Sequence, residues 1–463
     1  MLMLDPESID RTVLVAIHDG SQPTLEKAIN AKQNTGIVIC ADARVCTEAA
    51  GQAALLTAIL TSTRAFGSVY VVAAAPENRI LRGVFRGTRL ADVIEGEGAK
   101  EVSNTGISEL PGAWVVLLVG GETPVPEGLP TQEARTVLRI TWCGWVAGVS
   151  PGPNPLAQTE GNELSSIAAA AMGVHEAFGA LRLEAGSDEG FRTIDLNLWN
   201  PGAPANDSGP PLAYMPQAWW LIGLGHLGQA YSWVISWLAY PEPSTIEIVL
   251  QDTDRTVPAN HSTGVLTPRY SKGDQKTRLV STRLEQAGFK TRIIERRMVD
   301  DLRAASEEKH HVALLGVDNL ATRRLISNVG WKFAVDVGLG RGAVDFDSIL
   351  MRRFPGQKTS GEVAGWANEE RPAQIQVPSN EAFNDLRQNF EACGVVELAG
   401  KAVGASFVGI IAACLAVAEP GRELHGGSGI EVVNLALRSN DLKKAPAATK
   451  GDIVPSPLTS RLH

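Results

Sequence analysis

The sequence of 463 residues has little cysteine and no cysteine motif. Five cysteines occur, at positions 40, 46, 143, 393 and 414, and no two of them form a Cys-x-x-Cys pair. An odd number of scattered cysteines in a long chain disfavours a disulfide framework and the usual cysteine-rich structural zinc site. We therefore expect a protein of a reducing compartment, the cytoplasm.

Long apolar runs and an excess of positive charge are absent as well. The apolar segment 404–418 is rich in Ala and Gly and shorter than the about 18–20 apolar residues that a membrane span needs, so we expect a buried helix there. Acidic residues stand early in the N-terminal segment, which is atypical of a signal peptide. The formal net charge of −9 disfavours nucleic acid or an anionic membrane as the main partner.

The chain does contain repeated signals of a parallel α/β fold. Strand-like segments at 36–41 and 68–75 flank a helix-like run at 47–65 with few polar interruptions. After a segment rich in Gly, Pro, Asn and Asp, the strand pattern restarts at 218–222 and 245–250. Continuous apolar strands separated by helices are typical of a parallel sheet that is covered on both faces.

We therefore predict an α/β protein with a Rossmann-like, doubly wound, mostly parallel sheet in two tandem copies. A chain of 463 residues is also too long for one ordinary core. The expected parts are a first domain at 1–190, a linker at 191–216, a second domain at 217–438 and a mobile tail at 439–463.

An internal similarity supports two copies of one fold. The first half reads CGWVAGVSP and then SSIAAAAMGVHEAFGALR, and the second half reads CGVVELAG and then GASFVGIIAACLAVAEPGREL. In each half a Cys-Gly pair, at Cys143 or Cys393, precedes a small-residue helix that carries Glu176 or Glu419. The alternative is that two Ala-rich helices are alike by chance.

The most informative motif is the glycine pattern at Gly223, Gly225 and Gly228. It follows a strand and opens a helix, where such glycines permit a tight turn, close approach of the backbone to a phosphate, and close packing of helix on strand. Asp252 and Asp254 follow the next strand, where a carboxylate usually accepts the ribose hydroxyls. These residues fit a nicotinamide-dependent enzyme and other nucleotide-binding proteins equally.

The residues downstream distinguish the two classes. From Asp254 the chain continues to Asn260, Gly273 and Lys276, and later to Asp318 with Asn319 beside it. This arrangement resembles the adenylyltransferase family of the ubiquitin-activating enzymes and of the thiamine- and molybdopterin-biosynthesis activators of sulfur-carrier proteins. The resemblance extends over roughly 217–435.

The resemblance implies ATP and Mg²⁺ as ligands. By it, Asp254 holds the ribose, Asn260 orients the nucleotide phosphates, Lys276 contacts the phosphates and the developing charge, and Asp318 holds Mg²⁺. Asp318 also suits the N-cap of a helix expected at 320–330. The implied reaction is adenylation of the C-terminal carboxylate of a small ubiquitin-like protein or peptide. The product then passes to a thiol or another acceptor, such as a conjugating enzyme.

The sequence departs from the family at the phosphate-binding arginine. Where the family has Asn-x-x-Arg-Gln, this chain has Thr263 in place of the arginine, and a threonine cannot make a two-pronged contact with a phosphate. Arg255 and Arg269 are replacement candidates nearby in the sequence. Arg44 and Arg64 of the first half are others, since family members receive an arginine from a paired copy in a homodimer or an intramolecular pseudo-dimer.

The first half lacks the glycine motif, and its loop at 40–49 reads CADARVCTEA. Without glycine the backbone cannot approach a phosphate closely, so we interpret this half as a degenerate, non-catalytic copy. Cys393 matches a cysteine that serves a thiol step after adenylation in part of the family. Cys143 at the corresponding place in the first half favours a packing role instead.

No histidine pair shows metal-ligand spacing. His18, His175, His310 and His311 form no His-x-x-x-His pattern, so surface or core roles are expected for each. No metal other than Mg²⁺ is implied.

Two alternatives to a catalytic adenylation domain remain. A pseudoenzyme or scaffold of the same fold is supported by Thr263. An NAD(P)-dependent oxidoreductase accounts for the glycines and Asp254 but not for Lys276 or Asp318.

Overall fold

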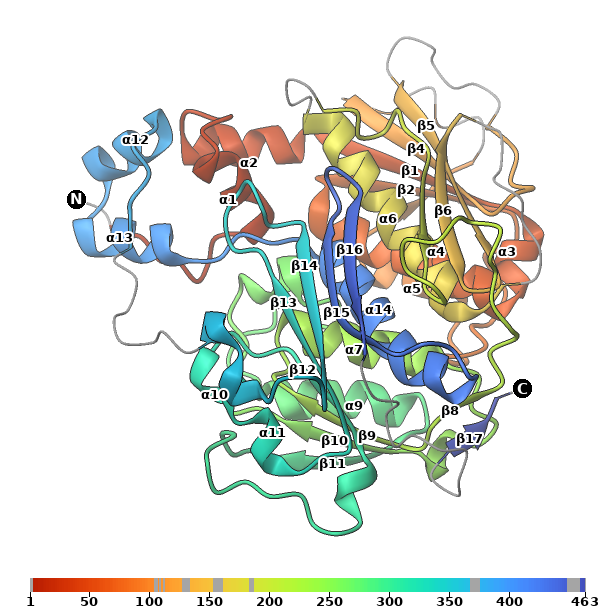
Figure 1. Cartoon of the computed structure of the whole chain (residues 1–463). Coiled ribbons are helices and arrows are strands. Elements are labelled where there is room, and N and C mark those ends of the chain that lie inside the picture. Colours follow the sequence, from red (N-terminus) through yellow and green to blue (C-terminus); the bar gives the residue numbers. More distant parts are fainter. Residues whose placement is uncertain are drawn as a thin grey trace.

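Two mixed sheets with a shared layer of helices make up the protein (Figure 1). The computed structural model describes residues 3–103, 107, 110, 113–126, 134–152, 161–182, 187–366, 375–447 and 459–462. The helices are α1 Arg11–His18, α2 Leu25–Gln33, α3 Ala43–Thr47, α4 Ala49–Ala65, α5 Leu90–Gly96, α6 Glu163–Arg182, α7 His226–Trp237, α8 Asn260–Thr263, α9 Lys276–Gln286, α10 Leu320–Arg324, α11 Ile326–Val329, α12 Glu381–Asn389, α13 Ala392–Gly400 and α14 Ser406–Leu424.

The first sheet has seven strands in the order β3-β2-β1-β4-β5-β6-β7. Its first five strands in that order are parallel, and β6 and β7 are antiparallel to their neighbours. The bounds are β1 Thr35–Ala41, β2 Ser68–Ala73, β3 Lys100–Glu101, β4 Ala113–Val119, β5 Ala134–Cys143, β6 Val146–Pro151 and β7 Ile194–Asn197.

The second sheet has eight strands in the order β11-β10-β9-β12-β13-β14-β15-β16. Five parallel strands are again followed by antiparallel ones. The bounds are β9 Ala218–Ile222, β10 Glu247–Gln251, β11 Lys290–Ile294, β12 Val312–Leu315, β13 Phe333–Leu339, β14 Ser348–Phe354, β15 Ile430–Ala436 and β16 Asp441–Pro446.

The two sheets share one topology. Numbered from their own first strands, both have the order 3-2-1-4-5-6-7, and the second sheet adds β16 at its edge. The predicted fold class, an α/β protein with two mostly parallel sheets, is therefore confirmed.

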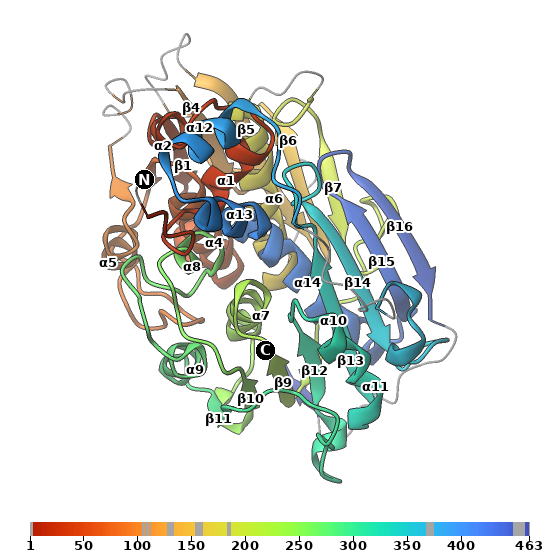
Figure 2. The same ribbon diagram turned by 90° about the vertical axis from the view of Figure 1, so that its left-hand side faces the viewer.

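Four helices form the layer between the sheets. In Figures 1 and 2 the pair α4 and α6 lies against the first sheet, and the pair α7 and α14 lies against the second. The pairs meet where α6 packs on α14 and where Trp233 of α7 donates a hydrogen bond from Nε1 to Thr57 Oγ1 of α4, 2.9 Å away. Small residues in α6 and α14 permit this close packing, and nearly all of their side chains are buried.

By length and composition alone, helix α6 could cross a membrane. The sequence predicted no such segment. However, 89% of its most apolar stretch is buried inside the protein. This burial is typical of a core helix of a globular protein.

Two expectations about the ends of the domains need correction. The predicted linker at 191–216 contains β7, a strand of the first sheet, and β8 Tyr214–Pro216. The predicted mobile tail at 439–463 supplies β16 and also β17 Thr459–Arg461, which pairs with β8. Short strands of polar composition carry a weak pattern, and only pairing with a neighbour stabilises them.

The N-terminal helices contact the second half of the chain. Asn380, the N-cap of α12, donates from Nδ2 to the carbonyl oxygens of Ile17 and His18 at the end of α1, and Figure 1 shows α12 and α13 beside α1. The amide of Ala259 donates to the carbonyl oxygen of Glu7. The first half therefore begins with a segment that packs on α8 and α12 of the second half.

Gly173 provides a test of the packing of α6 on the first sheet. A Cβ at this position would lie 2.5 Å from Ile140 Cγ2 and 2.9 Å from Leu117 Cδ1. We expect Gly173→Ala to lower the free energy of unfolding by about 1–3 kcal/mol through overpacking, measured by urea denaturation. The matched control is Gly96→Ala in α5, where a Cβ meets no atom within 4 Å. Equal stability of the two variants would contradict this account of the packing.

Candidate functional site

The candidate site lies at the carboxyl ends of three neighbouring parallel strands. Ile222 at the end of β9 is in register with Gln251 of β10 and with Leu315 of β12. The residues that follow these strands therefore meet at one edge of the second sheet, where Figure 1 shows β9, β10 and β12 together with α7. In open α/β sheets, ligands bind outside the carboxyl ends of the strands.

Each glycine of the loop has its own geometric role. Gly223 has a φ of +80°, and a Cβ there would lie 2.9 Å from the carbonyl oxygen of Gly316. A Cβ on Gly228 would collide with the carbonyl oxygen of Gly223. Gly225 is the N-cap of α7, and a Cβ there would meet no atom within 4 Å. The loop thus leaves open space in front of the N-terminus of α7, where backbone N–H groups attract an anion.

The two aspartates after β10 differ in what they contact. Asp252 accepts from the amide of Leu224 at Oδ2, over 2.5 Å, and from the amide of Asp254 at Oδ1, over 2.8 Å. It therefore ties the glycine loop to the end of β10. Asp254 is exposed and forms an ion pair with Lys276, with Nζ 3.1 Å from Oδ2. The structure brings together these two predicted site residues, and of the two aspartates Asp254 is the one exposed to solvent.

Asp318 is exposed at the end of β12, and its carboxylate forms no hydrogen bond or ion pair with the described residues. The N-cap of α10 is Asn319, whose side chain accepts from the amide of Thr322. The capping role considered for Asp318 thus falls to its neighbour, and the carboxylate faces solvent at the strand edge. A carboxylate in this position suits a hard cation such as Mg²⁺.

A half-buried arginine supports the loop that carries Asp318. Arg323 donates to the carbonyl oxygen of Val317 from Nε and Nη2 and to that of Val337 from Nη2. Its Nε also lies 3.4 Å from Asp336 Oδ1. Burial raises the pKa of Asp336 to about 6, although the charge of Arg323 acts in the opposite direction. The sequence pattern alone did not indicate this supporting role of Arg323.

Arg64 reaches the second half next to Thr263. Its side chain is 1% exposed and donates to the carbonyl oxygens of Gly264, Val265 and Thr267. Gln229 of α7 holds the same segment: its Oε1 accepts from the amide of Leu266, and its Nε2 donates to the carbonyl oxygen of Leu224. The sequence carried no signal that singled out Gln229.

The four candidate arginines differ in what they contact. The guanidinium of Arg64 is occupied by backbone carbonyls, and Arg44 pairs with Glu48 over 2.8 Å on α3 of the first half. Arg255 donates to the carbonyl oxygen of Gly273, and Arg269 is exposed beside a cavity between the halves. Asn260, at the start of α8, accepts from the amide of Val257.

Comparisons with known proteins identify the family. Residues 36–198 match the family model of the BilD N-terminal domain, and residues 215–427 match that of the BilD C-terminal domain. The bacterial E1-like protein BilD of Collimonas sp. (strain OK412) is 33% identical over 440 residues, which are 93% of this chain and 92% of that protein. The chain belongs to the bacterial E1-like BilD family.

Solved structures of E. coli MccB are more distant. A crystal structure of MccB with ATP has a TM-score of 0.31 at 12% identity, and the match covers 51% of this chain and 64% of that one. Another crystal structure of MccB has a TM-score of 0.32 at 12% identity, over 69% of this chain and 96% of that one. A similarity of this size transfers no residue role.

Cys393 lies away from the strand edge in this member of the BilD family. It is exposed in the first turn of α13, whose Gly394 packs against Leu4 of the N-terminal segment. Cys143 ends β5, directly before β6, whereas Cys393 follows β14 and α12. The equivalence of Cys143 and Cys393 expected from the sequence is therefore wrong. Cys143 gives no reason to assign Cys393 a packing role.

The first half shows how the corresponding strand edge looks without glycines. Asp42 follows β1, and its side chain accepts from the amide of Val45 as the N-cap of α3. A cavity of about 420 Å³ lies at this edge, lined by Asp42 and by Glu101 among others. Two carboxylates and a capped short helix make this edge unfavourable for a phosphate.

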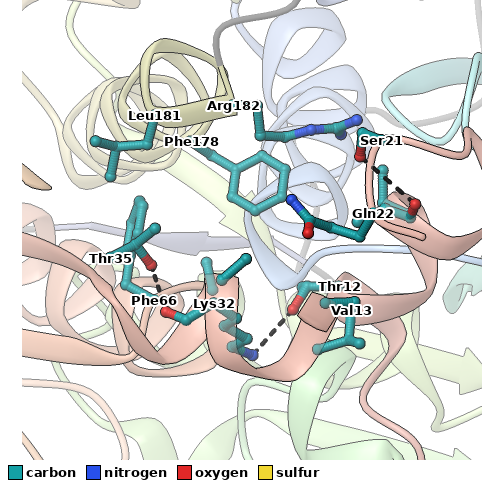
Figure 3. A pocket seen from close by; sticks show the side chains of 15 residues that line it. Thr12, Val13, Ser21, Gln22, Lys32, Thr35, Phe66, Phe178, Leu181 and Arg182 are labelled. Carbon is teal, nitrogen blue, oxygen red and sulfur yellow. Dashed lines mark hydrogen bonds between the residues drawn. The ribbon is translucent and has the colours of Figure 1, made fainter. Parts of the chain in front are cut away.

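A further cavity, of about 230 Å³, lies where α1, α2 and α6 meet (Figure 3). Its lining is mostly apolar and includes Phe66, Phe178 and Leu181. Lys32 there donates to Thr12 and to the carbonyl oxygen of Arg64, and it pairs with Asp10. None of the predicted site residues lines this cavity, so we do not assign the nucleotide site to it.

His226, the residue between Gly225 and Leu227, tests the packing of the loop. Its ring lies against α14, where a Cβ on Gly409 would come within 2.5 Å of it, and burial lowers its pKa to about 4. Between about pH 6.5 and pH 4 the unfolded chain therefore binds a proton that the folded protein excludes, so stability is lost as the pH falls through this range.

We expect the free energy of unfolding of the wild type, relative to His226→Gln, to fall by about 2 kcal/mol between pH 7 and pH 5. Urea denaturation at both pH values measures it. The control is His310→Gln, which replaces an exposed histidine and should show no such change. A difference between wild type and His226→Gln that does not vary with pH would contradict the buried neutral state.

Proposed function

We propose that this chain uses MgATP to adenylate the C-terminal carboxylate of a small ubiquitin-like protein or peptide. The observation that carries the proposal is the meeting, at one strand edge, of the glycine loop, the Asp254–Lys276 pair and the exposed Asp318. Membership of an E1-like family supports it and disfavours the nicotinamide alternative.

The residues fit the parts of one nucleotide. The open space at Gly225 and the N-terminus of α7 suit the phosphates, and Asp254 suits the ribose hydroxyls. Lys276 supplies a cation beside the phosphates. Asp318 would hold Mg²⁺, which neutralises charge on the phosphate oxygens when it is bound.

In the proposed reaction, an oxygen of the substrate carboxylate attacks the α-phosphorus of ATP. The bond from that phosphorus to the oxygen bridging to the β-phosphate breaks, and pyrophosphate leaves with the bonding electrons. The developing negative charge lies on phosphate oxygens, close to the place where Lys276 and the N–H groups of α7 can stabilise it.

We further propose that the first half, 1–190, is a degenerate copy of the second, 217–438. The common strand order supports this, and so do Glu176 of α6 and Glu419 of α14. Both glutamates are fully buried. Glu176 accepts a hydrogen bond from the amide of Gly190, just before β7, and Glu419 accepts one from the amide of Ile430, the first residue of β15. The first half would then serve as an intramolecular partner, acting in the reducing cytoplasm, with the five cysteines as free thiols.

A scaffold of the same fold is the second candidate. The observation that favours it is Thr263 at the family's arginine position, with the nearest buried arginine, Arg64, already occupied by carbonyl oxygens. Such a protein binds nucleotide without releasing pyrophosphate.

Lys276→Ala separates the two candidates. We expect it to reduce ATP–pyrophosphate exchange, measured with a carrier protein that ends in Gly, by about 10²–10³-fold, because a preorganised cation is lost at the phosphates. Lys272→Ala, which removes an exposed lysine of the same loop, is the matched control and should retain exchange. Full exchange in Lys276→Ala, or none in the wild type, would exclude the proposed adenylation mechanism.

Transfer after adenylation makes a separate prediction. We propose that Cys393 accepts the activated carboxylate as a thioester, with release of AMP. Cys393→Ser should then keep pyrophosphate exchange and lose the adduct that a reducing agent cleaves, as seen on non-reducing gels. Cys143→Ser is the control and should retain the adduct. A persisting thiol-sensitive adduct in Cys393→Ser would assign the acceptor to another cysteine or to another protein.

A further inference from the structure

A buried cluster of one imidazole and two carboxylates joins the two halves at a distance from the strand edge described above. His175 lies on α6, Glu189 precedes β7, and Asp347 precedes β14 in the second half. The three side chains are 2–6% exposed. One ligand atom from each lies within 4.8 Å of the other two.

The distances in this cluster are long for hydrogen bonds. His175 Nε2 is 3.4 Å from Glu189 Oε1 and 3.4 Å from Asp347 Oδ2. Charge-assisted hydrogen bonds are typically about 2.7–2.9 Å, and one N–H cannot point at two acceptors. Two ligands that each lie about 2.0–2.1 Å from a tetrahedral zinc ion are about 3.3–3.4 Å apart, which matches both distances.

The surroundings hold the ligands in place. His175 Nδ1 is 3.3 Å from Glu176 Oε1, and Glu176 is itself fixed by Arg192 Nη2 at 2.7 Å and by the amide of Gly190 at 2.8 Å. A histidine that ligates a metal commonly donates its other ring N–H to a carboxylate in this way. The second oxygen of Glu189 accepts from Ser187 Oγ over 2.8 Å.

The charges also suit a divalent ion. Arg192 pairs with Glu176, so the carboxylates that face the centre of the cluster are those of Glu189 and Asp347. Arg438 Nε is 3.5 Å from the Asp347 oxygen that faces His175.

We propose that His175, Glu189 and Asp347 bind a divalent transition-metal ion, zinc in the first instance, which fastens the first half to the second. Imidazole with carboxylate oxygens favours zinc over the oxygen-liganded Mg²⁺ and Ca²⁺. The ion competes with a proton for His175, so its affinity rises with pH.

The test is the metal content of the whole chain, purified without chelator and without a polyhistidine tag. Mass spectrometry of the elements should find about one zinc ion per wild-type chain, and His175→Gln and Asp347→Asn should lose it. His311→Gln is the matched control, since His311 is also buried but faces the single carboxylate of Glu247, over 3.0 Å.

Titration of the metal-free wild type with metal ions provides a second test, which does not depend on the folding of the variants. Metal-free wild type should bind Zn²⁺ at pH 8 and more weakly at pH 6. With Co²⁺ added instead, it should show the visible absorption of a site with nitrogen and oxygen ligands. Its melting temperature should be higher with zinc than without. A wild type that contains no metal and binds neither ion at pH 8 overturns the proposal, and so does equal binding in His175→Gln. These outcomes are independent of pyrophosphate exchange.

Discussion

The side chain of Arg64 extends from the first half of the chain into the second. Its guanidinium donates there to the carbonyl oxygens of Gly264, Val265 and Thr267. Burial lowers the pKa of this arginine, and the nearby charge of Glu97 acts in the opposite direction. A buried cation is tolerated only when its donors have partners, and the second half supplies three of the carbonyl oxygens that Arg64 contacts. Gln229 continues the connection from the same segment to the glycine loop, and the geometry of the candidate site therefore depends on the seam between the halves.

The contact between the halves also gives the first half, which lacks the glycine loop, a role in holding the second half in place. Helices α4 and α6 cover one face of the first sheet and present their other side to α7 and α14. Polar contacts cross between the halves at several places, among them Arg64, the Trp233–Thr57 hydrogen bond and the His175 cluster. Because these hydrogen bonds and ion pairs have directional requirements, they hold the two sheets in one relative position, which an apolar contact alone would not do. The proposed metal ion would strengthen the contact at His175.

The fold was predictable where the pattern is local and strong. Apolar strands such as β1 and β9 and long helices such as α6 are buried almost completely, so their composition reports their environment directly. Strands β16 and β17 escaped prediction because they are short, polar and stabilised only by a partner strand. Cys143 and Cys393 were wrongly equated because a shared Cys-Gly pair says nothing about which strand precedes it.

The sequence by itself determined the glycine loop and the carboxylates beside it. Gly223, Gly225 and Gly228 act through backbone geometry within six residues, and parallel strands must bring the ends of β9, β10 and β12 to the same edge. Only the tertiary structure decided what Arg64 contacts and that His175 meets Glu189 and Asp347. Spacing along the chain cannot reveal such sets, because their members stand far apart in the sequence and are brought together by the packing of one half on the other.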